Sequence, residues 1–241
     1  MSFLEIKGIS KSFRGLKAVS SATFDVDRGS IVALIGPNGA GKTTCFNMIA
    51  GVFAPDAGSI AFQDKPIQGL RPDQVCAAGI GRTFQIVKPF AGLSVLDNVI
   101  VGALQREGSV SSARVFSLSI LKKLKLDAKK DLPASSLTLP DRKRLEVARA
   151  LATRPTLLLL DEVMAGLRPT ECDEMVEVFR DLNRSDGLTI LLIEHVMRAV
   201  MALAQKVVVL HHGEIIARGA PAEVVRDRAV LECYLGEDAE V

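Results

Sequence analysis

The sequence predicts an α/β fold with a second, helical part inserted into it. Continuous apolar runs at Ile31–Ile35, Thr156–Leu160 and Leu188–Ile193 are typical of buried parallel strands. Near the N-terminus, apolar and charged residues alternate over Leu4–Ile9 and Phe24–Val26, which indicates two half-exposed antiparallel strands. In the middle of the chain the apolar spacing becomes helical. An antiparallel β subdomain and an inserted α-helical subdomain are therefore expected around a parallel core.

Composition sets the broad class. The 241 residues are 48% hydrophobic and 24% charged, which suits one large α/β domain or one domain with a subdomain. A net charge of +2 gives no reason to expect a nucleic-acid surface. No apolar run approaches the roughly 18 residues that span a bilayer, and the alternating N-terminus does not resemble a signal peptide. We expect a soluble chain unless a partner holds it at a membrane.

The four cysteines are expected to be packing residues. They lie far apart, with no C-x-x-C spacing, at Cys45, Cys76, Cys172 and Cys233. This pattern argues against a zinc site or a disulfide framework and fits a reducing cytosol.

Between the Ile31–Ile35 run and the helix expected over Thr44–Ala50 lies a glycine-rich segment. It consists of Gly36, Pro37, Asn38, Gly39, Ala40, Gly41, Lys42 and Thr43, which fits G-x-x-x-x-G-K-[ST] between a strand and a helix. Its glycines let the backbone curl until several N–H groups point at phosphate oxygens. Lys42 adds a positive charge, and Thr43 offers a hydroxyl to Mg²⁺. The segment predicts nucleotide-phosphate binding.

Two single residues in this half of the chain allow alternatives. Phe13 lies in the polar, turn-prone stretch Ser10–Gly15, where it could stack on an adenine ring or fill a core under a hairpin. A strand over Ile80–Ile86 carries Gln85, expected to be buried near its end. A lone glutamine is more often a solvated strand end, so it is a weak signal by itself.

Shorter elements complete the chain. Strands are expected over Ser59–Phe62, Val207–Leu210 and Ile215–Ala217, the last two joined at Gly213. Helices are expected over Pro72–Ala78, from Leu93 with Ser94 as its cap, over Ser112–Leu124, over Arg142–Ala152 with Asp141 as its cap, and after Thr170 as a cap.

A lysine cluster follows the middle of the chain and comprises Lys122, Lys123, Lys125, Lys129 and Lys130. It is interpreted as a solvated helix face or, alternatively, as a partner surface.

Carboxylates follow the leucine-rich strand Thr156–Leu160. Asp161 and Glu162 come at its C-terminal end, where a phosphate-loop protein holds Mg²⁺ and activates water. The strand Leu188–Ile193 ends at Glu194 and His195, which makes His195 a candidate γ-phosphate contact. His211 and His212 are expected in an exposed turn.

In this order, the motifs resemble those of ABC-type ATPase subunits over nearly the whole chain. Phe13 matches the adenine-stacking aromatic, Gly36 to Thr44 the Walker A loop, Gln85 the Q-loop, Leu157–Asp161 with Glu162 the Walker B strand, and His195 the switch histidine. The resemblance implies a P-loop NTPase (RecA-like) core. A single domain over 1–241 would comprise a nucleotide-binding core with its β subdomain, 1–86 and 156–241, and a helical subdomain, 87–155.

A narrower resemblance is to the ATP-binding subunits of branched-chain amino acid importers. It rests on Arg82–Gln85, Pro89–Val95, Asp161–Val163 with Ala165–Leu167, Pro169–Glu171 and the ending Tyr234–Gly236.

The resemblance implies a role for each matched residue. ATP would be bound by Phe13, Gly36, Pro37, Asn38, Gly39, Ala40, Gly41, Lys42, Thr43, Thr44 and, from a second subunit, Leu137 and Thr138. Mg²⁺ would be held by Thr43, Gln85 and Asp161. Glu162 would act as general base, His195 would steady the γ-phosphate, and Gln85 would sense the nucleotide.

The resemblance also implies partners. The working unit would be a head-to-tail homodimer, or a heterodimer with a paralogous ATPase, on transmembrane permease subunits at the cytoplasmic face of the plasma membrane. A periplasmic or extracellular solute-binding protein would act indirectly, and no nucleic acid is expected.

Three segments depart from the family pattern. The signature Leu-Ser-Gly-Gly-Gln aligns with Leu137–Asp141, where both glycines are lost and Pro140 has no N–H to offer. Arg168 replaces the D-loop aspartate, and the helical insertion is short around Gln105–Ser117. These changes put contact with the partner's γ-phosphate and communication across the dimer in question.

We expect an ATPase that powers import of a small polar solute, such as an amino acid. The alternative is a weakly hydrolysing ATP-binding subunit paired with a better-equipped paralogue; Leu139 and Pro140 favour it, whereas Glu162 and His195 oppose it. An ABC ATPase acting on nucleic acid is disfavoured, because the chain has neither a second cassette nor long coiled-coil arms.

Overall fold

The computed structural model describes residues 3–85 and 88–235, which form two compact units. The first unit comprises residues up to 78 and from 189 onward, and the second comprises residues 79–188. These limits differ from the expected subdomain limits at 86/87 and 155/156, so the functional subdomains stay a prediction. The expected strand end at Ile86 and the family-like Gly236 lie outside the described residues.

The first unit contains two groups of strands. An antiparallel sheet in the order β2-β1-β4-β5 is formed by β1 (Leu4–Phe13), β2 (Leu16–Val26), β4 (Ala57–Phe62) and β5 (Lys65–Pro66). A second group in the order β10-β9-β3-β8 contains β3 (Ile31–Ile35), β8 (Thr189–Ile193), β9 (Lys206–His211) and β10 (Glu214–Gly219). β3 pairs in parallel with β8 and β9, whereas β10 is antiparallel to β9. The alternating and continuous apolar patterns therefore predicted both kinds of strand, but β1 and β2 are longer than predicted: Ser10–Phe13, expected in a turn-prone stretch, belongs to β1.

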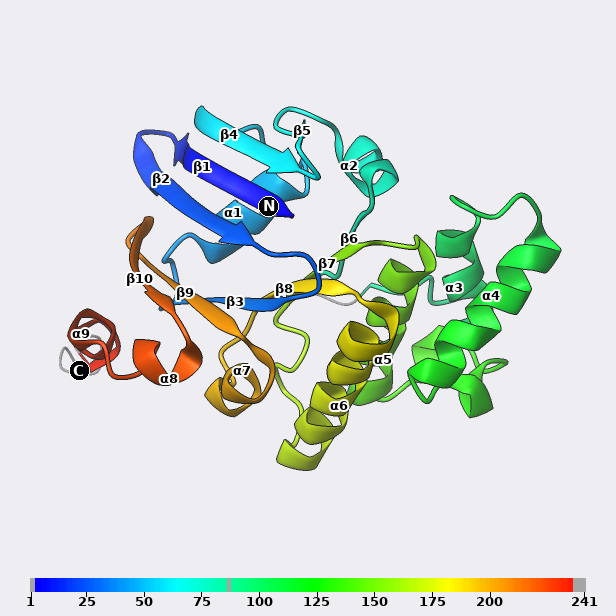
Figure 1. The fold of residues 1–241 in the computed structure, drawn as a ribbon. Coiled ribbons are helices and arrows are strands. Elements are labelled where there is room, and N and C mark those ends of the chain that lie inside the picture. The colour runs from blue at the N-terminus through cyan, green and yellow to red at the C-terminus, as the bar shows by residue number, and fades with distance from the viewer. Residues whose placement is uncertain (1–2, 86–87, 236–241) are drawn as a thin grey trace. The chain divides into compact units, whose positions relative to one another are not determined.

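Five helices of the first unit lie within its described residues: α1 (Lys42–Ile49), α2 (Pro72–Ala78), α7 (Met197–Leu203), α8 (Pro221–Val224) and α9 (Arg228–Leu235). Figure 1 shows α1 between the antiparallel sheet and the parallel strands. Cys45, Phe46 and Ile49 of α1 are fully buried there. Burial raises the pKa of the Cys45 thiol to about 12, so this cysteine is inert packing, as predicted.

The second unit combines one parallel strand pair with a set of helices. Its elements are β6 (Ile80–Arg82), α3 (Val95–Ala103), α4 (Val110–Lys123), the 3₁₀ turns Asp127–Lys129 and Ala134–Ser136, α5 (Leu139–Ala152), β7 (Leu157–Asp161) and α6 (Pro169–Asp186). β6 pairs with β7, and α5 packs against α3 and α4. The expected helical insertion is present (Figure 1).

The strand expected over Ile80–Ile86 is shorter than predicted. β6 ends at Arg82, and Thr83 donates one further backbone hydrogen bond, from its N–H to Leu159 O at 2.9 Å. In the parallel register Arg82 lies opposite Leu159, so β7, which ends at Asp161, has no residue left for Gln85 to pair with. Gln85 is consequently exposed, and the prediction that it is buried was wrong.

Two helix starts also differ from the prediction. α5 begins at Leu139, before Asp141, and α6 begins at Pro169, before Thr170, so neither Asp141 nor Thr170 is a cap. A proline in the first turn explains both cases, because its fixed φ suits a helix start and its missing N–H would have no partner there. Ser94 caps α3 as predicted, accepting from Asp97 N at 3.0 Å.

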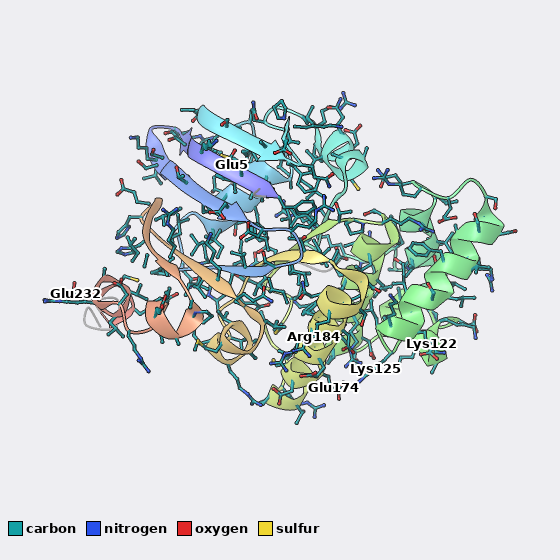
Figure 2. All side chains as sticks on the ribbon, in the orientation of Figure 1. Glu5, Lys122, Lys125, Glu174, Arg184 and Glu232 are labelled. Carbon is teal, nitrogen blue, oxygen red and sulfur yellow. The ribbon has the colours of Figure 1, made fainter. Side chains whose placement is uncertain are left out.

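The lysine cluster runs from the end of α4 to the 3₁₀ turn Asp127–Lys129 and the residue after it, and Figure 2 labels two of its members, Lys122 and Lys125. Lys123 pairs with Asp186, Lys130 pairs with Asp131, and Lys129 reaches Asp141, whereas Lys122 and Lys125 are exposed. Most of this charge is therefore balanced within the second unit, which favours the solvated face over a partner surface.

Candidate functional site

The candidate phosphate loop, residues 36–44, joins β3 to α1 in the first unit. Gly36, Gly39 and Gly41 have φ values of 147°, 78° and 103°, in the range that glycine adopts without strain. α1 begins at Lys42 directly after its N-cap residue Gly41, so the loop leads straight into a helix N-terminus. The local geometry is that of an anion-binding helix N-terminus.

The loop is supported from behind by neighbouring backbone. A Cβ at Gly36 would lie 1.9 Å from Leu210 O, and one at Gly41 would lie 2.3 Å from Ala18 O. Gly213 N, in the turn between β9 and β10, donates to Ala40 O at 3.0 Å. The sequence predicted Gly213 only as a turn residue, because a contact over so long a separation leaves no local pattern.

Lys42 is held inside the loop. Its Nζ donates to Gly36 O at 2.6 Å and to Pro37 O at 2.7 Å, and the residue is only 6% exposed. Thr43, the next residue, is exposed. A glycine cradle that a Cβ would fill, with a buried ammonium at a helix N-terminus, fits the phosphates of a nucleotide.

Replacing Gly36 by alanine is expected to weaken ATP binding by tenfold or more, because its Cβ would displace the loop from Leu210. Isothermal titration of Mg-ATP measures the change. Gly29→Ala is the matched control: Gly29 also has a positive φ, of 72°, but a Cβ there meets nothing within 4 Å. Equal ATP affinities of the two folded variants would contradict the steric account.

Phe13 and His195 lie at the surface of the first unit. Phe13 is 38% exposed at the end of β1, with its ring edge against Phe53 at 5.1 Å between centroids. It is therefore not a core residue beneath a hairpin. His195 follows β8 and is exposed, whereas Glu194 is buried. His212 is exposed as expected, but His211 is the last residue of β9 and is half-buried.

In the second unit, Asp161 ends β7 and is 1% exposed. Its Oδ2 accepts from Arg82 Nη2 at 3.2 Å, and its N–H donates to Thr83 Oγ1 at 3.1 Å. Its Oδ1 is buried and has no hydrogen-bond partner among the described residues. Burial raises the pKa of Asp161, and the Arg82 guanidinium opposes that shift. A buried carboxylate oxygen without a partner fits a divalent cation such as Mg²⁺.

Glu162 and Gln85 meet in the second unit. Gln85 Nε2 donates to Glu162 Oε2 at 2.6 Å, so two predicted site residues are brought together. Lys143 Nζ donates to Glu162 O at 2.9 Å, where the glutamate backbone has a φ of 50°. Such a conformation is uncommon outside glycine and needs support from its surroundings. Lys143 was missed from the sequence, and Arg82 was named only within the family-like segment Arg82–Gln85, because nothing local distinguishes their side chains from those of surface cations.

The signature-like segment Leu137–Asp141 leads into α5. Leu137 is buried, Thr138 and Leu139 are exposed, and Pro140 lies in the first helical turn. A Cβ at Gly166 would lie 3.3 Å from Leu139 Cδ2, so the segment before Arg168 adjoins this one. Arg168 is exposed, and its Nε donates to Glu171 Oε1 at 2.8 Å.

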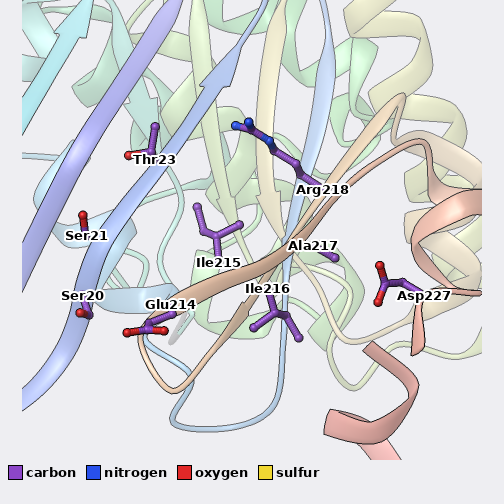
Figure 3. A pocket seen from close by; sticks show the side chains of 9 residues that line it. All are labelled: Ser20, Ser21, Thr23, Glu214, Ile215, Ile216, Ala217, Arg218 and Asp227. Atoms are coloured by element: carbon purple, nitrogen blue, oxygen red, sulfur yellow. The ribbon is translucent and has the colours of Figure 1, made fainter. Parts of the chain in front are cut away.

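The first unit also has a pocket of about 720 Å³ over β2 and β10. Its lining consists of Ser20, Ser21, Thr23, Glu214, Ile215, Ile216, Ala217, Arg218 and Asp227. Figure 3 shows Arg218 and Asp227 on opposite sides of the β10 ribbon. None of the candidate ATP-site residues lines this pocket.

The comparison with known protein families tests the resemblance that the motifs carry. The model described as "ABC transporter" matches residues 19–165, from β2 to just beyond β7. The chain belongs to the ABC transporter family. A second model, "Branched-chain amino acid ATP-binding cassette transporter", matches residues 214–240. This ABC protein is therefore a transporter ATPase.

Curated relatives match the ABC ATPase along nearly its whole length. The high-affinity branched-chain amino acid transport ATP-binding protein LivG of Escherichia coli is 35% identical, over 97% of this chain and 98% of LivG. The lipopolysaccharide export system ATP-binding protein LptB of Escherichia coli is 34% identical, over 99% of each chain. One of these relatives is named for amino acid transport and the other for lipopolysaccharide export.

Among solved structures, the ADP conformation of an ATP-binding cassette of an ABC transporter is similar to this ATPase. The TM-score is 0.88 at 31% identity, over 98% of this chain and 99% of that one. The expected fold class is thus confirmed. Within the described part of the chain, the helices are too short or too polar to cross a bilayer.

Proposed function

We propose that this chain is the ATP-hydrolysing subunit of an importer for branched-chain or related amino acids. The observation that carries the catalytic part is the group at the end of β7, where Glu162 accepts from Gln85 directly after the buried Asp161. The likeness to LivG and the second family model at residues 214–240 support the solute class.

The first unit would bind the nucleotide. The backbone N–H groups of the phosphate loop and the Lys42 ammonium would hold the phosphates, and Phe13 would stack on the adenine. The hydroxyl of Thr43, with Gln85 and Asp161 of the second unit, would hold Mg²⁺. When bound, Mg²⁺ would neutralise charge on the phosphate oxygens.

Hydrolysis would depend on Glu162 and His195. The Glu162 carboxylate would take a proton from the attacking water, and the Gln85 amide would orient that carboxylate. His195 would donate a hydrogen bond to the γ-phosphate. Gln85 is exposed and lies beyond the end of β6, so its side chain would report the state of the nucleotide to the rest of the second unit.

Two copies would act together, head to tail, with Leu137 and Thr138 of one contacting the ATP of the other. Such a pair would lie against permease subunits at the cytoplasmic face of the plasma membrane, with a solute-binding protein on the other side. The second candidate, a weakly hydrolysing member of a heterodimer, is favoured by one observation: Pro140 has no N–H to offer in the first turn of α5.

Uptake of labelled solutes tests the transport proposal. Cells lacking this chain are expected to lose uptake of leucine, isoleucine or valine, and the wild-type chain is expected to restore it. Lys42→Ala should fail to restore uptake at equal expression, whereas Lys65→Ala, a change of an exposed lysine, should restore it. Unchanged uptake of all three amino acids in the deleted cells would overturn the assigned solute class.

A further inference from the structure

At the start of α5, one hydroxyl and two charged groups form a cluster within the second unit. The α5-start cluster consists of Thr138, Asp141 and Lys129. Thr138 Oγ1 donates to Asp141 Oδ2 at 2.7 Å, and Lys129 Nζ donates to the same oxygen. On the other carboxylate oxygen, Arg144 Nη1 lies 3.9 Å away. The cluster therefore holds the hydroxyl of a candidate ATP-binding residue through an internal carboxylate.

Asp141 is ionised in this setting. The residue is only 4% exposed, and burial by itself would raise the pKa of its carboxyl. The hydrogen bonds from Lys129 and Thr138, together with the charges of Lys129 and Arg144, outweigh burial and lower that pKa. A buried, charged acceptor makes stronger hydrogen bonds than a neutral one does. Thr138 therefore faces a strong acceptor inside its own chain.

The proton of the Thr138 hydroxyl can be donated only once. While it goes to Asp141 Oδ2, the hydroxyl can accept a hydrogen bond but cannot donate one to a phosphate oxygen. Pro140 cannot compensate, because it has no N–H. The carboxylate of Asp141 also adds negative charge beside any anion that approaches the start of α5.

We propose that Asp141 is a positioning residue that restrains the signature-like segment by withdrawing the Thr138 hydroxyl from the partner's ATP. The inference rests on the proposed function, in which Thr138 of one chain contacts the nucleotide bound by a second chain. Lys129 moderates the restraint, because its ammonium shares and partly neutralises the Asp141 carboxylate. Closure of the pair then requires the Thr138 hydroxyl to leave Asp141. The protein concentration for half-maximal dimer is therefore higher than it would be without the Asp141 carboxylate.

The test measures ATP-driven pairing in the Glu162→Gln background by sedimentation velocity at saturating Mg-ATP. Asp141→Ala, which removes the acceptor, is expected to lower the protein concentration for half-maximal dimer by about tenfold. Asp141→Asn, which leaves a weaker neutral acceptor, should give a smaller decrease. Lys129→Met should raise that concentration, because the carboxylate then binds Thr138 without competition.

The two variants Asp141→Ala and Lys129→Met are expected to shift the protein concentration for half-maximal dimer in opposite directions. This difference separates a restraint on Thr138 from a merely structural role of Asp141. Asp141→Ala and Lys129→Met break the same ion pair, so a purely structural contribution would shift pairing in the same direction for both. Adding Thr138→Ala to Asp141→Ala should abolish the gain, since the released hydroxyl is then missing. In the hydrolysis assay without the Glu162 change, Asp141→Ala should lower the half-maximal protein concentration more than it raises the rate at saturation.

Two results overturn the inference while leaving the proposed function intact. One is ATP-driven pairing of the Glu162→Gln protein that Asp141→Ala leaves unchanged or weakens, with folding verified by circular dichroism. The other is a shift of the half-maximal protein concentration in the same direction for Asp141→Ala and Lys129→Met. Failure of every variant to pair with ATP at any protein concentration would instead contradict the proposed function itself.

Discussion

Glu162→Gln is expected to reduce Mg-ATP hydrolysis at least about 100-fold while ATP binding is retained. The amide cannot accept the proton of the attacking water, but it can still accept the hydrogen bond that Gln85 Nε2 gives to Glu162. The position of the side chain should therefore survive while its basicity is lost. Phosphate release and nucleotide titration measure the two properties separately.

Retained binding without turnover should also trap two chains around ATP. Sedimentation velocity should show an ATP-dependent dimer of the variant. Glu177→Gln is the matched control, because Glu177 is an exposed carboxylate of α6 in the same unit, and it should keep the wild-type rate. A Glu162→Gln protein that is saturated with ATP yet monomeric at high concentration would rule out the shared site.

Lys42→Ala is expected to lower ATP affinity about 100-fold, the effect of losing a charge-assisted hydrogen bond of up to roughly 3 kcal/mol. Lys42 is buried, and its ammonium also bonds Gly36 O and Pro37 O, so the variant loses both the charge and a support of the loop. Isothermal titration of Mg-ATP measures the affinity.

Lys65→Ala, which removes an exposed lysine from the same unit, controls for the loss of one positive charge and should bind ATP normally. Thermal unfolding without nucleotide checks that the Lys42→Ala protein is folded. A folded Lys42→Ala variant with wild-type affinity would mean that the phosphates bind elsewhere than at residues 36–44.

Elements with a strong local signal were predictable. β3 has the predicted bounds Ile31–Ile35 and α2 the predicted bounds Pro72–Ala78, because an uninterrupted apolar run and a first-turn proline each act within a few residues. The same holds for the glycines of the phosphate loop, whose positive φ values follow from the motif itself. Local sequence patterns were thus sufficient to predict the parallel strand β3 and the phosphate loop of the candidate site.

What depends on distant partners could not be predicted. Gln85 is exposed because β7 ends at Asp161 and leaves it no strand residue to pair with. Asp141 is buried in contact with Lys129, which lies in an earlier turn of the chain. Lys143 supports the backbone of Glu162 from another element altogether. Each of these contacts joins residues whose separation in the chain leaves no periodic trace, so only the folded structure shows them.

The dependence of wild-type Mg-ATP hydrolysis on protein concentration tests the shared two-chain site most directly. If the ATP bound at residues 36–44 of one chain is completed by Thr138 of another, the rate should rise more steeply than linearly with protein, then become proportional once the pairs are full. A rate strictly proportional to protein from nanomolar concentrations upward, in a protein that sediments as a monomer throughout, would contradict that account.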